Sequence, residues 1–170
     1  MESYAQPFFS LFKSATGCIL DVDGVLTDGR LLITDKGKQL RIMNIRDGYA
    51  IQLAVKKGLF VAAISGSTSR GVAKRLNRLG VNQVFFGEQD KAFILKKITK
   101  KNKLDLSRII YVGDDFPDIE AMKLCGVPCC PADAIPEILS FAKYISHLGG
   151  GNGCVRDVLE KVLKLQERWE

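Results

Sequence analysis

The sequence predicts an α/β fold in which a parallel β-sheet is covered by helices on both faces. Three observations lead to this prediction: short, continuously apolar runs recur along the chain, amphipathic stretches separate them, and polar or acidic residues follow several of the runs. Continuously apolar strands are typical of parallel sheets buried on both faces, and the helices supply the crossovers that parallel strands require.

Five apolar runs are expected to form the strands: 17–22, 59–65, 83–86, 108–112 and 127–129. Helices are expected between and after them, at 48–57, 69–79, 91–101, 118–124, 135–142 and 155–167. An insertion at about 29–45 interrupts the alternation, and its two extended segments around the turn 35–38 indicate a β-hairpin. We therefore expect one Rossmann-like domain over residues 1–170, three layers thick, with this hairpin after the first strand.

The composition is that of an ordinary globular domain, with 46% apolar and 26% charged residues. The net charge of +6 could indicate a nucleic-acid surface, and it would also favour an anionic substrate. The basic residues mostly stand among acidic ones, and the lysine pairs at 96–97 and 100–101 lack interleaved aromatic residues. We therefore expect the solvated face of a helix there and no nucleic-acid partner.

The five cysteines form no CxxC pair, and the single His147 cannot complete a zinc site, so we expect buried thiols in a reducing compartment. Residues 1–14 lack a charged start followed by a long apolar run, so no signal peptide is expected. The longest apolar run, 59–64, is too short to span a bilayer. The resulting expectation is a cytoplasmic protein with no membrane partner.

Asp21 and Asp23 end the first predicted strand, where residues i and i+2 point to the same face. Asp114, Asp115 and Asp118 follow the fourth strand, and parallel sheets bind ligands at the carboxyl ends of their strands. Carboxylates this close repel one another unless a cation lies between them or one holds a proton. Either set alone could cap a loop or helix, but both at matching strand ends predict a site for a hard cation such as Mg²⁺.

Two further positions could hold a phosphate. Ser65 and Gly66 follow the second strand, where a hydroxyl and a backbone N–H at the turn into a helix can bind a phosphoryl oxygen. Serine is also a common N-cap, so this pair alone is a weak signal. Lys91 opens a predicted helix, where it could neutralise a phosphate and a nucleophile or simply face solvent.

In this order the four elements resemble the haloacid dehalogenase superfamily of phosphohydrolases, with the motifs DVDGVLTD (21–28), ISG (64–66), QDKA (89–92) and GDDFPD (113–118). The resemblance implies that Asp21 attacks phosphorus to form an aspartyl-phosphate, while Asp23 acts first as an acid and then as a base. It implies Mg²⁺ bound by Asp21, the carbonyl oxygen of Asp23, and Asp114. Ser65 and Lys91 would hold the transferring group. The supporting carboxylates would be Asp115 and Asp118.

Members of this superfamily usually carry a cap domain, but the first gap here holds only the hairpin, and residues 66–90 have room for one helix, one strand and a turn. We therefore expect no cap. The segment NIRDGYA (44–50), the GDD motif with Asp118, and the stretch 149–156 are similar to 3-deoxy-D-manno-octulosonate 8-phosphate (KDO 8-P) phosphatases of lipopolysaccharide KDO biosynthesis. That resemblance implies a homotetramer in which the hairpins form a central barrel and a neighbouring subunit covers the active site.

The same resemblance implies which residues bind the sugar acid. The expected contacts are Asn44, Arg46, Asp47, Gly48, Gly66, Asp23 and Lys91, with Arg75 at the anionic end. Asp47 could instead cap its own helix, and Arg75 could be a surface arginine.

Three positions depart from the family pattern. Gln52, Ser67 and Asn152 stand where the family often carries basic residues, which leaves the phosphatase motifs intact but removes positive charge. A related capless group acts on the 9-phosphates of nine-carbon keto acids of the KDN or sialic acid type. That group typically has a glutamate at the position of Ser67 and lacks the RDGY run, so the sequence favours the eight-carbon substrate.

Other functions remain open from the sequence. A phospho-acceptor signalling domain combines similar residues, but its acidic pair lies at the first strand and it needs no hairpin. A scaffold that keeps the fold without catalysis would not need all four motifs. A capless phosphatase for protein or nucleic acid would be a monomer with an open basic groove.

Overall fold

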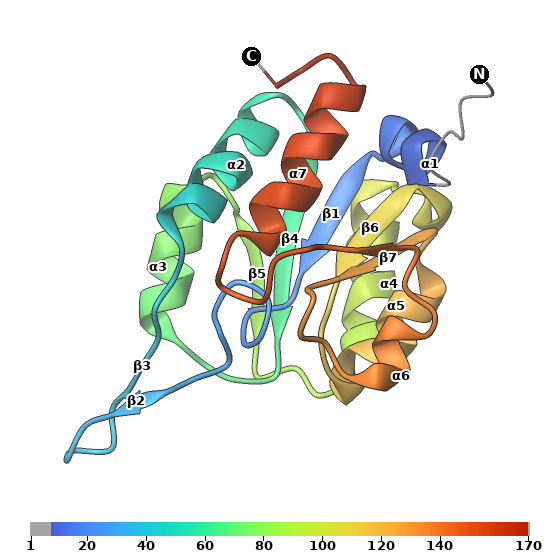
Figure 1. The fold of residues 1–170 in the computed structure, drawn as a ribbon. Helices are drawn as coiled ribbons and strands as arrows, with labels where there is room; N and C mark the ends of the chain where they lie inside the picture. Colours follow the sequence, from blue (N-terminus) through green and yellow to red (C-terminus); the bar gives the residue numbers. More distant parts are fainter. Residues whose placement is uncertain (1–7, 170) are drawn as a thin grey trace.

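The computed structural model describes residues 8–169, and at its centre is a six-stranded parallel sheet (Figure 1). In space the strands follow the order β5, β4, β1, β6, β7, β8. Their bounds are β1 Gly17–Leu20, β4 Phe60–Ser65, β5 Gln83–Phe86, β6 Ile109–Val112, β7 Val127–Cys130 and β8 Tyr144–Ile145. The prediction of no signal peptide concerns residues 1–14, of which 1–7 lie outside the described residues.

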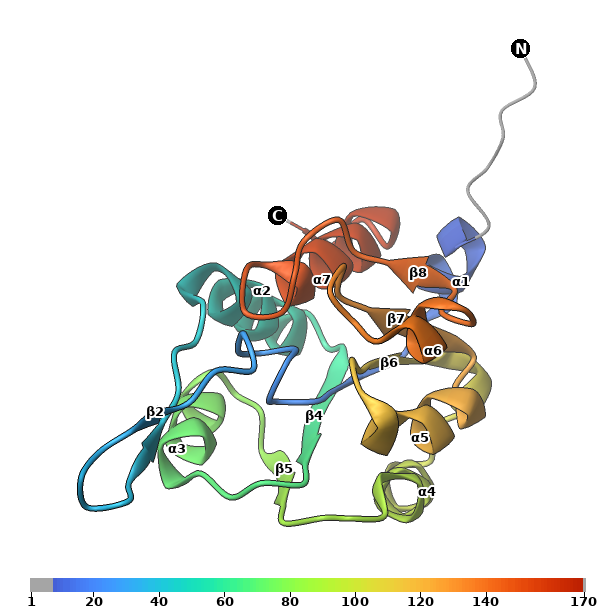
Figure 2. The same ribbon diagram turned by 60° about the horizontal axis from the view of Figure 1, so that its bottom comes forward.

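Helices cover both faces of the sheet, with α2 and α7 on one side and α4 and α5 on the other (Figure 2). Their bounds are α1 Phe8–Ser14, α2 Ile45–Lys56, α3 Arg70–Arg78, α4 Lys91–Asn102, α5 Ile119–Leu124, α6 Pro136–Leu139 and α7 Cys154–Leu165. Side chains of β1 alternate between two buried clusters. Cys18 and Leu20 pack on the side of α2 and α7, whereas Ile19 packs on the side of α4 and α5. Because both faces are apolar, the strands appear in the sequence as continuous runs.

The α/β prediction is confirmed, and all five predicted strands are present. The short elements α1 and β8 were not predicted, because seven and two residues are too few to show a period. The hairpin is shorter than expected: only β2 (Leu32–Ile33) pairs with β3 (Gln39–Leu40), and the pair projects from the body of the molecule (Figure 1). Within residues 8–169, no segment forms a cap domain over the sheet.

The cysteines are free and buried, as predicted. Burial raises the pKa of Cys125 and of Cys130 to about 12, so these thiols stay protonated near neutral pH.

Among residues 8–169, every helix falls short of the length and hydrophobicity that a membrane crossing requires.

The strand register places the carboxyl ends of β1, β4 and β6 side by side. Leu20 of β1 pairs with Ala63 of β4 and with Val112 of β6. The Asp21 N–H continues the ladder by donating to the Val112 carbonyl oxygen at 3.0 Å. The segments that follow these three strands therefore converge at the lower end of the sheet in Figure 1.

Candidate active site

A cavity of 310 Å³, here called the carboxylate cavity, lies where the ends of β1, β4 and β6 converge. It is lined by Asp21, Asp23, Gly24, Gly29, Ser65, Gly66, Ser67, Glu88, Gln89, Lys91, Asp114, Asp115 and Pro117. The residues predicted for catalysis and metal binding are therefore brought together in one place.

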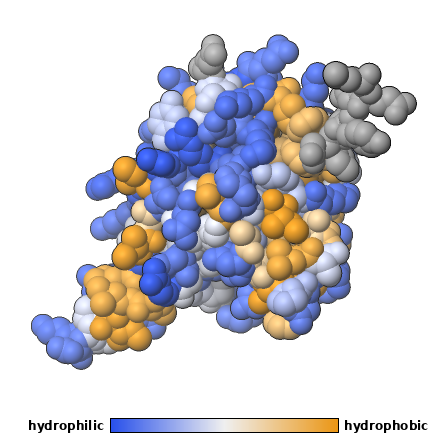
Figure 3. All heavy atoms as spheres, in the orientation of Figure 1, coloured by the Kyte–Doolittle hydropathy of each residue, from blue (hydrophilic) through white to orange (hydrophobic). Residues whose placement is uncertain are grey.

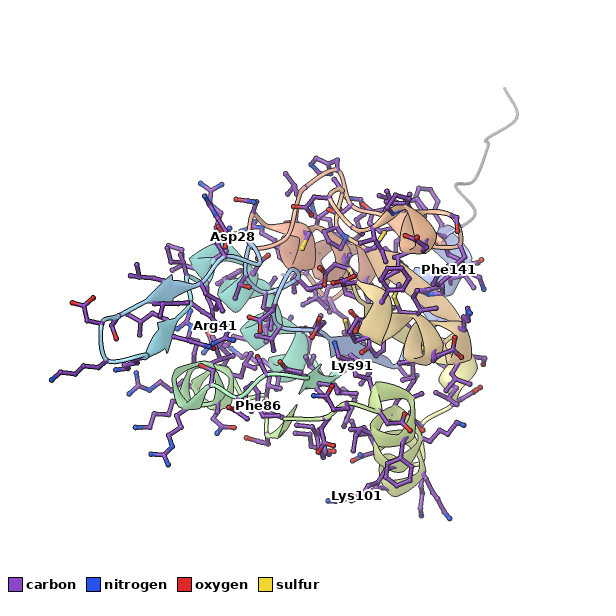
Figure 4. The ribbon with its side chains drawn as sticks, turned by 90° about the horizontal axis from the view of Figure 1, so that it is seen from below. Asp28, Arg41, Phe86, Lys91, Lys101 and Phe141 are labelled. Carbon is purple, nitrogen blue, oxygen red and sulfur yellow. The ribbon has the colours of Figure 1, made fainter. Side chains whose placement is uncertain are left out.

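Lys91 opens α4 and reaches the cavity with a side chain that is only 3% exposed (Figure 4). Its Nζ lies 2.8 Å from Asp21 Oδ1 and 2.8 Å from Asp118 Oδ1. Asp118 is completely buried and also accepts from the Tyr111 hydroxyl at 2.9 Å and from the Asp114 N–H at 3.3 Å. Asp118 thus holds the ammonium group in place beside Asp21 through charge-assisted hydrogen bonds.

The pKa values of Asp21 and Lys91 follow from their burial and from the charges around them. Burial raises the pKa of Asp21 well above its usual value, Asp118 raises it further, and Lys91 opposes both. Burial alone would lower the pKa of Lys91, but the carboxylates of Asp118 and Asp21 outweigh it and raise the pKa. Lys91 is therefore a cation at neutral pH, and Asp21 needs further positive charge beside it to be ionised.

The donor set fits a hard divalent cation. One carboxylate oxygen from each of Asp21, Asp114 and Asp118 lies within 4.8 Å of the others. Among the described residues Asp114 Oδ1 is buried without a hydrogen-bond partner, and burial, Asp118 and Asp115 raise the pKa of Asp114 to about 7. Crowded carboxylate oxygens of this kind suit Mg²⁺. Because Asp118 already accepts hydrogen bonds on both oxygens, Asp21 and Asp114 are the side chains best placed to bind such an ion.

Glycines let the backbone pass close to these carboxylates. Gly24 has a φ of +89°, and a Cβ there would lie 2.0 Å from Asp114 Oδ2. A Cβ on Gly150 would lie 1.9 Å from the Gly24 carbonyl oxygen, and the Gly151 N–H donates to the Val25 carbonyl oxygen at 2.9 Å. The glycine run before α7 therefore packs on the loop after β1 of its own chain.

Asp23 is held by Arg41, a side chain that the sequence did not single out. Arg41 follows β3, and its Nε donates to Asp23 Oδ1 at 2.6 Å while its Nη2 donates to Asp23 Oδ2 at 3.0 Å. Ser67 Oγ donates to Asp23 Oδ2 at 2.6 Å and accepts from Arg41 Nη2 at 3.0 Å. Burial would raise the pKa of Asp23, but the hydrogen bonds from Arg41 and Ser67 outweigh it and lower the pKa below its usual value. No local spacing pattern in the sequence joins Arg41 to Asp23.

The predicted sugar-acid contacts around residue 46 lie outside the carboxylate cavity, at the N-terminus of α2. Asn44 caps α2 by accepting from the Arg46 N–H at 2.8 Å, and its Nδ2 donates to the Gly151 carbonyl oxygen at 3.2 Å. Asp47 is 1% exposed, and its Oδ1 accepts from the Arg156 N–H of α7 at 2.7 Å. Asp47 therefore caps α7 and not its own helix. The sugar-acid contacts of these residues stay predictions.

A second cavity of 1020 Å³, here called the hairpin groove, lies between the hairpin and α3. Its basic lining residues are Lys38, Arg41, Arg70, Lys74 and Arg75, and no acidic residue lines it. Arg75 crosses closely over Gly48, where an added Cβ would lie 2.6 Å from Arg75 Nη2. Arg41 connects this groove to the carboxylate cavity, because it also contacts Asp23.

Comparison with known proteins agrees with this geometry. A model of haloacid dehalogenase-like hydrolases matches residues 77–153. The chain is 36% identical, over 148 residues, to the 3-deoxy-D-manno-octulosonate 8-phosphate phosphatase KdsC of Salmonella typhi, an alignment that covers 87% of this chain and 79% of that protein.

Two solved structures of similarly named phosphatases resemble this one. The first, from Moraxella catarrhalis in complex with a magnesium ion, a phosphate ion and KDO, has a TM-score of 0.94 and 31% identity, covering 98% of this chain and 95% of that chain. The second, a cobalt-bound form from Haemophilus influenzae, has a TM-score of 0.89 and 28% identity, covering 94% and 93%. The chain therefore belongs to the family of 3-deoxy-D-manno-octulosonate 8-phosphate phosphatases within the haloacid dehalogenase-like hydrolases.

Proposed function

We propose that this protein is a Mg²⁺-dependent phosphatase that removes phosphate from KDO 8-P through an aspartyl-phosphate on Asp21. One observation carries the proposed chemistry: the buried ammonium of Lys91 lies 2.8 Å from Asp21 Oδ1, at the wall of a cavity that also holds Asp23 and Asp114. The substrate assignment is supported by the 36% identity to the Salmonella typhi phosphatase and by the likeness to the structure that holds KDO and phosphate.

In the first step, an Asp21 carboxylate oxygen attacks phosphorus and the bond between phosphorus and the sugar oxygen breaks. The protonated form of Asp23, which the hydrogen bonds from Arg41 and Ser67 disfavour before substrate binds, gives its proton to that sugar oxygen. In the second step, Asp23 takes a proton from water, which attacks phosphorus and releases phosphate from Asp21. Lys91 and Ser65 bind the phosphoryl oxygens, so the transferring group is positioned while its charge is neutralised.

Asp21, the Asp23 carbonyl oxygen and Asp114 would hold Mg²⁺, which when bound neutralises charge on the phosphate and on the two carboxylates. The raised pKa of Asp114 and its unpartnered Oδ1 support this assignment. A neighbouring cation would stabilise the ionised carboxylate and would give Oδ1 a partner. The Moraxella catarrhalis structure is described with a magnesium ion.

The hairpin groove has basic lining residues and no acidic ones, which supports an acidic substrate. A phosphate bound next to Lys91 would leave the other end of a sugar acid free to extend past Asp23 toward the basic residues that α3 contributes to the groove. We propose that this groove attracts the carboxylate end of the substrate, with Arg75 as one of its cations.

We further propose that the protein forms a homotetramer through its hairpins. Apolar side chains on and beside the hairpin are exposed, and orange spheres cover this projection behind its blue tip in Figure 3. They are Leu31, Leu32, Ile33, Leu40, Ile42 and Ile45, with Ile42 80% exposed. A contiguous apolar surface on a projecting element is typical of a protein interface. The buried, unpaired cysteines support a reducing, cytoplasmic compartment.

The test is a phosphate-release assay with Mg²⁺ over KDO 8-P, nine-carbon keto acid 9-phosphates, hexose phosphates and a phosphopeptide. We expect the highest kcat/KM for the eight-carbon keto acid. A higher value for any other ester would contradict the substrate assignment, and release from none of them would contradict the phosphatase assignment.

A further inference from the structure

Arg41 is placed unlike a surface arginine. Its side chain is 3% exposed, although it follows a strand of the projecting hairpin. Arg30, near the start of the same insertion, also pairs with an aspartate, Asp28, but its side chain is 87% exposed. Arg41, which is labelled in Figure 4, instead turns toward the carboxylate cavity. There it makes a two-pronged contact with Asp23. Such a fork fixes the plane of a carboxylate as well as its distance.

The contacts leave one acceptor position on the Asp23 carboxylate. A carboxylate offers about four lone-pair positions, two on each oxygen. Within the described residues, Oδ2 accepts from Arg41 Nη2 and from Ser67 Oγ, so both of its positions are used. Oδ1 accepts from Arg41 Nε alone. A proton can therefore join or leave Asp23 at Oδ1 while the hydrogen bonds from Arg41 and Ser67 stay in place.

We propose that Arg41 is a positioning residue for the acid/base group: from the hairpin it holds the Asp23 carboxylate in one orientation and leaves Oδ1 as the oxygen that exchanges the proton. This inference rests on the proposed function, because it assigns a partner to the residue that protonates the leaving group. Ser67 completes the arrangement, since its hydroxyl bridges Arg41 and Asp23 and reaches Ser65 Oγ at 3.1 Å.

Two other roles for Arg41 predict different behaviour. If Arg41 only ties the hairpin to the body, its loss should lower stability and slow all substrates alike. If Arg41 binds the substrate carboxylate, its loss should raise KM only for substrates that carry one. A positioning role predicts a loss that grows with the leaving group's need for a proton, even when the substrate has no carboxylate.

The experiment measures kcat/KM with Mg²⁺ for p-nitrophenyl phosphate, phenyl phosphate and benzyl phosphate. These esters are similar in size and carry no second anion. Their leaving groups differ in how much they need a proton: p-nitrophenol needs it least, phenol more, and benzyl alcohol most. The parameter kcat/KM covers formation of the phosphoenzyme, the step in which Asp23 acts as an acid. The variants are Arg41→Ala and Arg41→Lys, with Arg108→Ala as the matched control at the opposite end of the sheet, where Arg108 Nε donates to the Ser14 carbonyl oxygen.

We expect Arg41→Ala to reduce kcat/KM for benzyl phosphate by about 10- to 100-fold and for p-nitrophenyl phosphate by less than about 3-fold. General acid catalysis usually contributes about 100- to 10,000-fold, so this loss corresponds to part of the contribution of a misplaced acid that is still present. Arg41→Lys should recover part of the loss, because one ammonium can bind only one of the two oxygens well. Arg108→Ala should reduce all three values alike or leave them unchanged. Ser67→Ala removes a single contact to Asp23 and should show the same dependence on the leaving group with a smaller loss. This variant tests the proposal if Arg41→Ala does not fold.

Equal losses on all three esters in Arg41→Ala and Ser67→Ala, or no loss, would overturn the proposal. So would a loss confined to KDO 8-P and expressed in KM, which would assign Arg41 to the substrate carboxylate. Hydrolysis of KDO 8-P by the wild-type protein is measured alongside, so a failure of the proposed function is distinguishable from a failure of the Arg41 assignment.

Discussion

Lys91 Nζ and Asp21 Oδ1 lie 2.8 Å apart inside the fold, and Asp118 Oδ1 lies 2.8 Å from the same nitrogen. The ammonium group therefore serves two buried carboxylates at once. Removing either carboxylate would leave the other paired, but removing the lysine would leave both without their cation.

Lys91→Met should destabilise the metal-free protein by about 3–5 kcal/mol, the usual loss when one partner is taken from a buried ion pair. Denaturant unfolding without Mg²⁺ measures this effect. Adding Asp118→Asn to Lys91→Met should recover part of the stability, since one of the two uncompensated charges is removed. Lys123→Met removes a lysine from an exposed pair with Glu120 and should leave stability unchanged. A Lys91→Met protein as stable as the control would contradict the described charge balance.

Asp114→Asn should abolish the response of the protein to Mg²⁺. In the wild-type protein Mg²⁺ should raise Tm in a concentration-dependent way, because an ion that binds only the folded state stabilises it. In the metal-free state the variant should be at least as stable as wild type, because burial already raises the pKa of Asp114 to about 7 and its charge is costly.

Thermal melts over a Mg²⁺ series provide the measurement, and Asp105→Asn, an exposed cap far from the cavity, is the control. The control should keep the wild-type response. An undiminished Mg²⁺ shift in Asp114→Asn would place the ion elsewhere.

Asp47 should make stability fall as the pH rises. Burial raises the pKa of Asp47 to about 6, and its Oδ2 has no hydrogen-bond partner among the described residues. A folded-state pKa above the unfolded value means that the stabilisation is complete below about pH 4 and is lost as the pH rises through about 6. Asp47→Asn keeps an oxygen for the Arg156 N–H but carries no charge.

From pH 4 to pH 7, the unfolding free energy of wild type should therefore fall by up to about 3 kcal/mol relative to that of Asp47→Asn. Urea denaturation at several pH values tests this. The exposed Glu137→Gln should follow the wild-type curve. Parallel curves for wild type and Asp47→Asn would mean that Asp47 is not the group that titrates.

Leu32→Lys with Ile42→Lys should convert an oligomer to a monomer. Leu32 is 65% exposed and Ile42 80% exposed, and lysines at these positions would bring like charges together in any interface built from hairpins. Analytical ultracentrifugation gives the assembly state. Phe93→Lys on α4, where the side chain is 61% exposed, is the control and should keep the wild-type mass. A monomeric wild-type protein would remove the proposed interface.

Asp21, Ser65 and Asp114 could be located from the sequence because each of them stands at or just after the end of a strand, whereas Lys91 opens a helix. Asp21, Ser65 and Asp114 are adjacent in space because β1 lies between β4 and β6, and strand-end positions can be read from apolar runs. The fold class was predictable because strands that are buried on both faces appear in the sequence as continuous apolar runs.

Contacts between distant segments could not be predicted. Arg41 reaches Asp23 from an insertion outside the sheet, and Asp47 caps α7, 109 residues further along the chain. Neither pair leaves a spacing pattern, because both depend on how the hairpin and α7 pack and not on a local period. The sequence left open that Asp47 caps its own helix, but Asn44 occupies that position.

Transfer of the phosphoryl group to Asp21 is tested most directly by trapping it in Asp23→Asn with p-nitrophenyl phosphate and Mg²⁺. This ester needs no proton for its leaving group, but the variant lacks the base that activates water, so the phosphoenzyme should accumulate. We predict a burst of one p-nitrophenol per active site and, after acid quench, a phosphoryl group on Asp21 by peptide mass spectrometry, with neither signal once Asp21→Asn is added. Turnover that persists in Asp21→Asn, or a burst with the phosphoryl group on another residue, would contradict the assignment of Asp21 as the nucleophile.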